Sequence, residues 1–342
     1  MKAAIIGVTG YGGLELVRII ENHPVLELGT LHSHSMHDNS LASFYPGLQG
    51  LVTTAVEAID VEQIMAENDL VFFATPSGIS RELAIPFVKK NFPIIDLSGD
   101  LRLKNPADYQ RWYKKEPAPQ ALLDAACYSV PEFSVITGNL VANPGCYATA
   151  AELSVAPLAL AGVLDPTSLI FDGKSGLSGA GKNLAEASHF VNVHDNMSMY
   201  KLNQHQHIPE ITQQLQLWDP AIQGIQFTTS LIPVTRGIFM TTYAKIKTPL
   251  TETEIYQLFE QTYQEKPFVR IQPQGSLPNL KQVIGSNFCD IGLGLNEETQ
   301  VLTIVAVIDN LVKGAAGLAI QNFNKWAKID ETSGLKVIPQ FI

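Results

Sequence analysis

The strongest constraint on this chain is a glycine-rich turn close to its N-terminus. A short apolar run, residues 3–6, leads directly into Gly7-Val-Thr-Gly-Tyr-Gly-Gly13, and residues 14–21 follow with the spacing of an amphipathic helix. Strand, glycine turn and helix in this order predict a βα unit whose backbone turns sharply and approaches a pyrophosphate. The free N–H groups at the helix N-terminus would meet the charge of that pyrophosphate.

The glycine spacing, G-x-x-G-x-x-G, is a variant of the dinucleotide-binding pattern G-x-G-x-x-G. A tight turn that needs glycine for steric reasons alone is the alternative. An NAD site carries Asp or Glu at the end of the second strand, on the ribose 2′-hydroxyl. Here that strand ends in Leu31-His-Ser-His-Ser35, without a carboxylate, so a 2′-phosphate would meet hydroxyls and imidazoles. The sequence therefore favours NADP over NAD.

Length and composition exclude several classes of protein. The 342 residues are too many for one hydrophobic core, which stops growing near ~250 to 300 residues. A net charge of −10 offers no broad basic surface, so we expect no nucleic-acid partner. The cysteines Cys127, Cys146 and Cys289 form no paired framework, and no long apolar segment opens the chain. We expect a cytoplasmic protein with no membrane partner.

The chain changes character near its middle. Its first half alternates short apolar runs with helix-period segments, which is typical of a parallel sheet wound with helices. From Ser168 onward, four longer segments rich in β-branched residues predict a mixed sheet: 225–234, 237–247, 288–295 and 301–309. A second domain is predicted to begin near 143–146. Residues 310–327 read as one helix, which we expect to pack back on the first domain.

Cys146 is the candidate nucleophile. It stands in Asn143-Pro-Gly-Cys-Tyr-Ala-Thr149, after an apolar strand and before a helix-forming run. A helix N-terminus favours the thiolate and lowers the pKa of a cysteine. Cys127 and Cys289 are better explained as small packing residues.

The acid or base partner of a thiol is sought among the histidines. His205-Gln-His207-Ile-Pro-Glu210 marks a helix start, with His207 expected in the loop before it. A solvated or capping histidine is one alternative. A zinc site with His189 and His194 is another, but no metal-ligand spacing is present. The histidines 32, 34 and 37, with Asp38, read as a solvated or phosphate-facing loop for the same reason.

Together these segments resemble the N-acetyl-γ-glutamyl-phosphate reductases, acyl-phosphate reductases of arginine biosynthesis. The resemblance covers nearly the whole chain, and Asn-Pro-Gly-Cys-Tyr is its most specific part. Its segments are Gly7 to Glu15, Ala74 to Gly78, Asp96 to Arg102, Val130 to Glu132, Asn143 to Thr149, Lys174 to Gly181, His205 to Ile211, Pro233 to Gly237 and Gly285 to Asn287. Two departures, at 127–132 and at Gln206, remove no chemical group that the mechanism needs.

The resemblance implies an α/β fold with an N-terminal NADP-binding Rossmann domain and an α+β catalytic and dimerisation domain with a mixed sheet. The first would comprise residues 1–145 and 310–342, and the second residues 146–309. It further implies a cytoplasmic homodimer or homotetramer that takes a small acyl-phosphate substrate.

The resemblance also implies a chemistry. The Cys146 thiolate attacks the acyl phosphate and forms a thioester, NADPH delivers hydride, and the hemithioacetal collapses to an aldehyde. His207 would be the general acid or base, with His205 as the alternative. Arg102, Arg236 and Lys182 would bind the anionic substrate. The predicted cofactor-binding residues are Gly7, Thr9, Gly10, Tyr11, Gly12, Gly13, Ser33, Ser77, Gly78, Pro144 and Asn287.

Three rival functions have weaker support in the sequence. Residues 176–183 nearly spell a P-loop, but Asn183 stands where Mg²⁺ binding calls for Ser or Thr. An aspartate-semialdehyde dehydrogenase would use the same chemistry on a shorter acyl phosphate, and the segment from His205 to Glu210 argues against it. A catalytically silent NADP-binding regulator would have no need of Cys146 in its Asn-Pro-Gly turn.

Overall fold

The computed structural model describes residues 1–247 and 249–341. The chain divides into two compact units. The first consists of Met1–Gly145 and Ala315–Lys336, and the second of Cys146–Gly314 and the described residues after Lys336. None of the helices in the described residues has the length and apolar character needed to cross a membrane.

The first unit is built on an eight-stranded sheet in the order β3-β4-β2-β1-β5-β6-β8-β7. Its strands are β1 (Lys2–Ile6), β2 (Glu27–His32), β3 (Asn39–Ser40), β4 (Ala55–Glu57), β5 (Leu70–Phe73), β6 (Ile94–Asp96), β7 (Cys127–Tyr128) and β8 (Leu140–Ala142). All neighbours pair in parallel except β3 and β4. Its helices are α1 (Tyr11–Ile20), α2 (Leu41–Phe44), α3 (Val61–Glu67), α4 (Ser80–Lys89), α5 (Pro106–Tyr113), α6 (Gln120–Ala125) and α11 (Gly317–Trp326), with a 3₁₀ turn at Pro46–Leu48.

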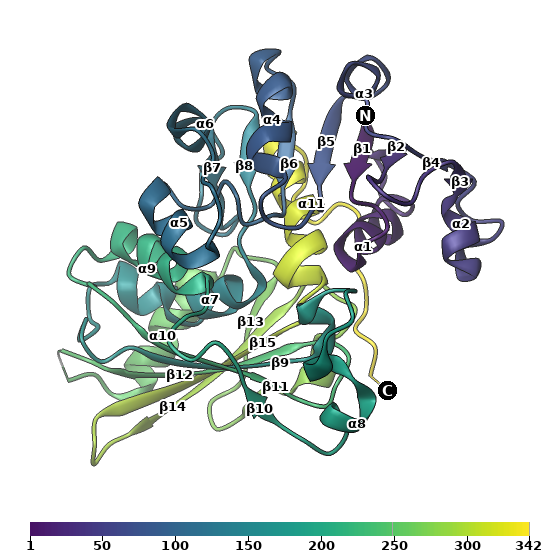
Figure 1. The fold of residues 1–342 in the computed structure, drawn as a ribbon. Helices are drawn as coiled ribbons and strands as arrows, with labels where there is room; N and C mark the ends of the chain where they lie inside the picture. The colour runs from purple at the N-terminus through teal and green to yellow at the C-terminus, as the bar shows by residue number, and fades with distance from the viewer. Residues whose placement is uncertain (248, 342) are drawn as a thin grey trace. The chain divides into compact units, whose positions relative to one another are not determined.

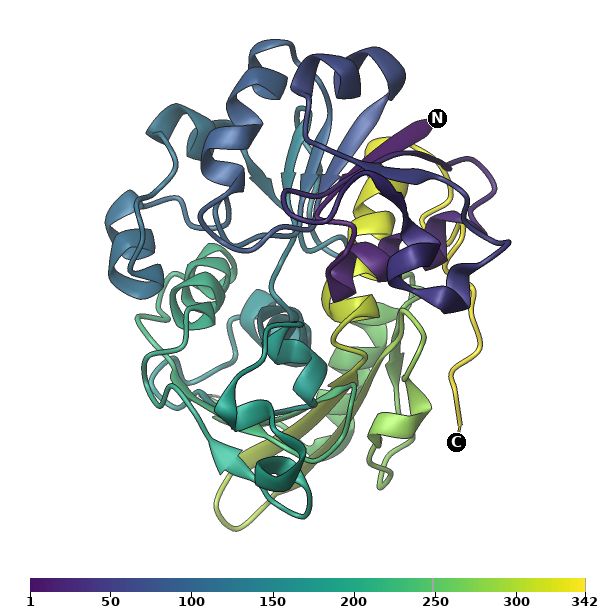
Figure 2. The ribbon, with the colours of Figure 1, turned by 45° about the vertical axis from the view of Figure 1, so that its right-hand side comes forward.

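Helices cover both faces of this sheet. Figures 1 and 2 show α1 and α11 on one face and α3, α4 and α6 on the other. Residues 3–6 of β1 and all of β5 are therefore fully buried, which explains why these strands read as uninterrupted apolar runs. Because β1 leads to β2 on one side and has β5 on the other, the carboxyl ends of β1 and β5 form the switch point at which open α/β sheets bind ligands.

The last helix differs from its prediction in one respect. The expected single helix over 310–327 begins instead with a five-residue π-helix, Val312–Ala316, which continues into α11. As expected, α11 packs within the first unit, against α1. The Nε2 atom of His23 lies 2.9 Å from Oδ1 of Asn324, which ties this helix to the segment after α1.

The second unit is built on a seven-stranded mixed sheet in the order β10-β11-β9-β12-β15-β14-β13. Its strands are β9 (Ile170–Ser175), β10 (Ser198–Met199), β11 (Gln226–Leu231), β12 (Ile238–Lys245), β13 (Val269–Ile271), β14 (Cys289–Asn296) and β15 (Val301–Ile308). β9 pairs with β11 and β13 with β14 in parallel, and the other pairs are antiparallel. Its helices are α7 (Cys146–Leu160), α8 (Phe190–Val193), α9 (His207–Trp218) and α10 (Glu252–Tyr263), with 3₁₀ turns at Leu177–Ala180, Glu186–Ser188 and Leu280–Gln282.

Helix α7 packs directly on strands β12 and β15, and α9 and α10 pack against α7 (Figure 1). The four long strands predicted from β-branched segments correspond to β11, β12, β14 and β15. The prediction of an α/β protein with a parallel first sheet and a mixed second sheet is thereby confirmed.

The unit boundaries differ from the predicted residue ranges at two places. Residues 310–314, and the described residues after 336, group with the second unit and not with the first. Asn310 is held there because its Oδ1 atom accepts from the Gly237 N–H at 2.7 Å. The C-terminal segment is held because the Gln340 N–H donates to the Ile284 carbonyl at 2.8 Å.

Two buried carboxylates hold the turn after β5. Asp100 accepts from the backbone N–H groups of Gly78, at 2.6 Å, and Arg81, at 3.1 Å. Asp96 accepts from the Ser80 hydroxyl at 3.0 Å. Burial, with repulsion from Asp100, raises the pKa of Asp96 from 3.8 to about 6.

The raised pKa of Asp96 predicts a pH-dependent stability. The folded state binds more protons than the unfolded state between the two pKa values, so the free energy of unfolding falls as pH rises through that range. Relative to Asp96→Asn, the wild type should lose at most about 3 kcal/mol from pH 4 to pH 7, at about 1.4 kcal/mol per pKa unit. Urea unfolding across this range measures the difference. Asp124→Asn, at an exposed carboxylate, is the control. The prediction would be contradicted if the free energy of unfolding had the same dependence on pH in the wild type and in Asp96→Asn.

Candidate active site

The glycine turn between β1 and α1 has a packed side and an open side. Gly7 has φ +90°, and a Cβ atom there would lie 2.5 Å from the Ala74 carbonyl oxygen. A Cβ atom at Gly13 would lie 2.5 Å from the Gly7 carbonyl oxygen. These two glycines therefore allow strand, turn and helix to pack closely. At Gly12, by contrast, a Cβ atom would meet nothing within 4 Å.

The open side of the turn suits a dinucleotide pyrophosphate. Helix α1 begins after Gly10, which offers no side chain to cap it, and the first turn carries no acidic residue. The N-terminal N–H groups and the positive end of the helix dipole are therefore available to an anion. Tyr11, the first helical residue, is exposed beside them.

The end of β2 lies beside this turn. The Thr9 and Ser33 hydroxyls are 3.5 Å apart, and the Tyr45 hydroxyl donates to the Thr9 carbonyl at 2.6 Å. The prediction that His32 lies in a solvated or phosphate-facing loop is wrong. It is fully buried, with one ring nitrogen 2.9 Å from the Ala58 carbonyl and the other 2.8 Å from the Thr30 hydroxyl, so it serves to join strands.

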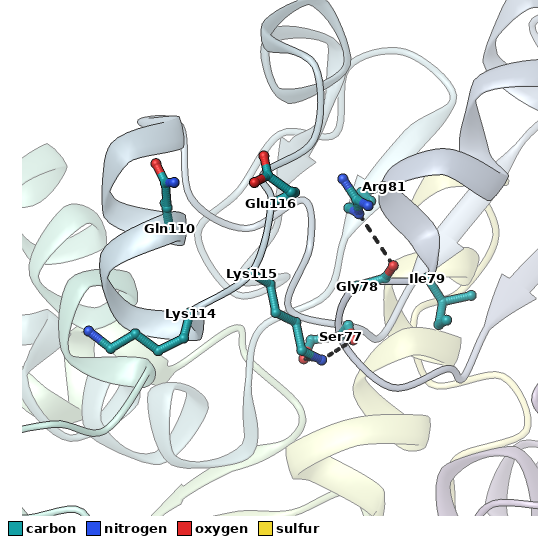
Figure 3. A pocket seen from close by; sticks show the side chains of 8 residues that line it. All are labelled: Ser77, Gly78, Ile79, Arg81, Gln110, Lys114, Lys115 and Glu116. Atoms are coloured by element: carbon teal, nitrogen blue, oxygen red, sulfur yellow. Dashed lines mark hydrogen bonds between the residues drawn. The ribbon is translucent and has the colours of Figure 1, made fainter.

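Ser77 and Gly78 form one wall of a pocket of about 680 Å³, shown in Figure 3. The Lys115 ammonium donates to the Ser77 carbonyl and, at 3.0 Å, to the Ser77 hydroxyl. Gly78 has φ +95°, and the Lys115 side chain lies where a Cβ atom of residue 78 would project. Asp100 holds the same turn through the Gly78 N–H. The sequence patterns do not include Lys115, and they include Asp100 only as part of the segment from Asp96 to Arg102, without a role of its own.

Cys146 is the first residue of α7 and is partly exposed, whereas residues 147–159 are all buried. The predicted position of the thiol at a helix N-terminus is confirmed. Pro144, just before it, is buried, and the Arg102 guanidinium donates to the Asn143 carbonyl at 2.8 Å. Two N–H groups of Arg102 are thus engaged by backbone carbonyls, the second by Leu97 at 2.7 Å. Arg102 thereby supports the chain just ahead of the cysteine.

The predicted histidines pack against Tyr147, the residue that follows the predicted cysteine in the second unit. The ring centroid of Tyr147, the residue after Cys146, is 5.4 Å from that of His205 and 6.2 Å from that of His207. The ring centroids of His205 and His207 are 4.7 Å apart. Helix α9 begins at His207, so this residue stands on the helix and not in the preceding loop as predicted. The helix starts this early because Pro209 is tolerated in the first turn, where an N–H has no intrahelical partner.

The two histidines have different surroundings. His205 is 4 % exposed and surrounded by aromatic rings, and burial, with repulsion from His207, lowers its pKa to about 2. Its Nδ1 atom accepts from the His207 backbone N–H at 3.2 Å. His207 instead has the buried Glu210 carboxylate 4.0 Å from its Nε2 atom. The sequence pattern identifies Glu210 only as a sign of a helix start.

The end of β15 organises several predicted residues. The Asp309 carboxylate lies 3.3 Å from Nε of Arg236 and accepts from the Gly285 N–H at 2.8 Å. Gly285 opens the segment that carries Asn287, which is buried. One carboxylate therefore contacts Arg236 and binds the start of the segment that leads to Asn287. Lys182, by contrast, is exposed.

Among the described residues, no group of three or more His, Cys, Asp or Glu side chains is arranged to hold a metal ion.

Family models match both units. The model of the semialdehyde dehydrogenase NAD-binding domain matches residues 2–136, and that of the semialdehyde dehydrogenase dimerisation domain matches residues 146–310. Solved structures share the fold at low identity. Aspartate semialdehyde dehydrogenase II from Vibrio cholerae has a TM-score of 0.70 and 16 % identity over 96 % of this chain and 98 % of its own. The enzyme from Candida albicans, solved with NADP, has a TM-score of 0.68 and 15 % identity over 93 % and 96 %.

Curated relatives are much closer in sequence. The N-acetyl-γ-glutamyl-phosphate reductase of Listeria monocytogenes serovar 1/2a is 53 % identical over 342 residues, which cover 100 % of both chains. That of Streptococcus thermophilus is 52 % identical over 344 aligned positions, again covering 100 % of both. The resemblance inferred from the motifs is confirmed: the chain belongs to the N-acetyl-γ-glutamyl-phosphate reductase family, within the semialdehyde dehydrogenases.

Proposed function

We propose that this chain, an oxidoreductase by its family, reduces N-acetyl-γ-glutamyl phosphate to N-acetylglutamate semialdehyde and phosphate with NADPH, in arginine biosynthesis. Full-length identity of 52–53 % to curated reductases of that name supports the substrate. The observation that carries the mechanism is the partly exposed Cys146 at the start of α7, followed by Tyr147, whose ring packs against those of His205 and His207.

Cys146 acts as the nucleophile in this proposal. The N-terminus of α7 favours its thiolate, which attacks the acyl carbon, expels phosphate and leaves a thioester. NADPH, when bound, supplies a hydride to the thioester carbon. The resulting hemithioacetal oxyanion collapses to the aldehyde and releases the thiolate. Backbone N–H groups at the start of α7 are the donors proposed for the oxyanion.

His207 acts as the general acid and base. It accepts the proton of the Cys146 thiol as the thiolate forms and passes that proton to the departing phosphate, and a proton from solvent then restores the thiolate–imidazolium pair. The Glu210 carboxylate, 4.0 Å away, stabilises the imidazolium. His205 stays neutral at physiological pH because its pKa is lowered to about 2, and it positions His207 by accepting the backbone N–H.

A pyridine nucleotide is the cofactor that the matching NAD-binding domain model indicates. NADP rather than NAD is our proposal. Ser33 at the end of β2, with Thr9 and Tyr45 beside it, offers hydroxyls and no carboxylate to a 2′-phosphate. The glycine turn with Thr9 and Tyr11 would hold the pyrophosphate. Ser77, Gly78, Pro144 and Asn287 remain proposed contacts of the nicotinamide half.

Substrate charge requires cations in an acidic protein. Arg236, held by Asp309, is the proposed ligand of the substrate carboxylate or phosphate, since a guanidinium can bind either group with two hydrogen bonds. Arg102 and Lys182 remain proposed ligands, the former with two of its N–H groups already bound to backbone carbonyls.

A homo-oligomer is also proposed, in keeping with the dimerisation-domain model that matches the second unit. Ile170 on β9 and Tyr243 on β12 are neighbours in register, and both are exposed, at 41 % and 38 %. This apolar pair offers a second copy a contact on the sheet. The choice between dimer and tetramer and the cytoplasmic location stay predictions.

The role of Cys146 predicts a loss of turnover on substitution. Cys146→Ser should lower phosphate-dependent NADP reduction with N-acetylglutamate semialdehyde by a factor on the order of 10³ or more, because the serine hydroxyl is not ionised near neutral pH. Cys127→Ser, at another partly exposed cysteine, should retain the activity. Retained activity in Cys146→Ser would favour a non-catalytic role for the thiol. Equal or greater wild-type rates with aspartate semialdehyde would overturn the proposed substrate.

The two histidines should be distinguishable by the pH dependence of kcat/KM. His207→Asn should lower the rate roughly 10²- to 10⁴-fold and remove one limb of the profile. Glu210→Gln should keep the limb but move it to lower pH, because the imidazolium loses its carboxylate. His205→Asn should lower the rate without changing the shape of the profile. A limb that disappears with His205 and persists without His207 would reverse the assignment.

The cofactor preference should depend on the end of β2. Ser33→Asp should lower kcat/KM for NADPH relative to NADH by roughly 10- to 100-fold, because a carboxylate there repels the 2′-phosphate. Ser43→Asp adds the same charge at an exposed position on α2 and is the control. An unchanged NADPH to NADH ratio in Ser33→Asp would place the 2′-phosphate elsewhere.

A further inference from the structure

A π-helix follows β15 at Val312–Ala316. The Gly314 N–H donates to the Asp309 carbonyl, five residues earlier, at 2.9 Å. The Asp309 side chain fixes the start of this segment by accepting from the N–H groups of Leu311, at 2.8 Å, and Val312, at 3.3 Å. π-helical turns are rare and occur frequently at functional sites.

Gly314 brings this segment against the candidate nucleophile. A Cβ atom at position 314 would lie 2.7 Å from Cβ and 3.1 Å from Cα of Cys146. It would also lie 3.3 Å from Cδ1 of Ile308. Non-bonded carbon atoms separate at about 3.5 to 4.0 Å. Only glycine therefore fits at position 314 while Cys146 keeps its place.

Helix α7 has little freedom to move away from an added methyl group. Its residues from 147 to 159 are buried, and α7 packs on β12, β15 and α9. Shifting the whole helix would disturb that packing, which interiors resist. Cys146, at the partly exposed end, is the part of α7 with room to yield. Pressure from position 314 would therefore change the position of the thiol first.

We propose that Gly314, set in the π-helix, is a positioning residue for the Cys146 thiol. The inference rests on the proposed nucleophilic role of Cys146. The close approach of the Gly314 backbone fixes the first residue of α7, so that the sulfur keeps its relation to the helix N-terminus and to His207. A displacement of a fraction of an ångström is enough to impair a nucleophile that depends on such a geometry.

The Asp309 carboxylate extends this arrangement. The group that anchors the π-helix also contacts Arg236 and the Gly285 N–H. The thiol and the proposed substrate-binding arginine are therefore positioned from the same few residues at the end of β15.

Gly314→Ala tests the proposal through the reactivity of the thiol. Alkylation of Cys146 by iodoacetamide, followed by peptide mass spectrometry from pH 5 to 10, should slow at least tenfold at neutral pH, with its midpoint at higher pH. The value of kcat should fall at least tenfold, while KM for NADPH changes less than twofold. Alkylation and kcat within twofold of wild type would overturn the proposal.

Gly292→Ala is the matched control. Its Cβ atom would lie 2.7 Å from the Ser276 carbonyl oxygen and 2.8 Å from Pro278, so it creates a comparable clash against residues outside the site. This variant should lose thermal stability but keep the alkylation profile. An equal change in alkylation would mean that any overpacked glycine loosens the thiol, which would overturn the proposal.

A stability cycle gives an answer even if Gly314→Ala alone folds poorly. In a Cys146→Gly background the closest clashing atom is absent, so Gly314→Ala should lower Tm much less than it does in a Cys146→Ala background. Equal losses of Tm in the two backgrounds would show that the contact is not with residue 146. The alkylation rate and Tm do not depend on turnover, so an active Cys146→Ser variant would refute the proposed function separately.

Discussion

The proposed chemistry depends on one constraint, the burial of helix α7. Every residue from 147 to 159 is buried, and the helix packs on the central strands of its sheet, so its axis and its first residue are fixed together. A cysteine at the exposed end of such a helix gains the favourable effect of the helix N-terminus on its thiolate without exposure of the rest of the helix. Tyr147, one position further, packs its ring against those of both histidines, so the start of α7 and the proposed proton carrier belong to one packed cluster.

Polar contacts within the second unit converge on residues 309 and 310. Asn310 accepts from Gly237 and donates to the Ser178 hydroxyl at 3.0 Å, while Asp309 contacts Arg236 and Gly285. Loops from three parts of the sequence are thereby held at the end of one strand. Buried carboxylates and amides that bind backbone N–H groups are costly to replace, because their partners would be left without hydrogen bonds.

Local patterns in the sequence were sufficient to predict the strand–turn–helix unit, the helix that begins at Cys146 and the mixed second sheet, because each is set by nearby residues. They did not separate glycines with different roles: Gly7 and Gly13 serve packing, and only the structure shows the open space at Gly12. The difference between His205 and His207 required knowledge of burial. Patterns did not identify Asp309 and Gly314, because their partners Arg236 and Cys146 lie far away in the sequence.

The discontinuity of the first unit has a consequence for its biogenesis. Residues 315–336 complete a core that otherwise belongs to the first 145 residues, and α11 covers the same sheet face as α1. During synthesis on the ribosome, that face must stay without its final cover until residues 315–336 have emerged. Domains generally fold as units and in order of emergence. Here residues 1–145 must wait for a segment that is made after the whole second unit up to Gly314, and an uncovered apolar face on the nascent chain is a natural substrate for chaperones.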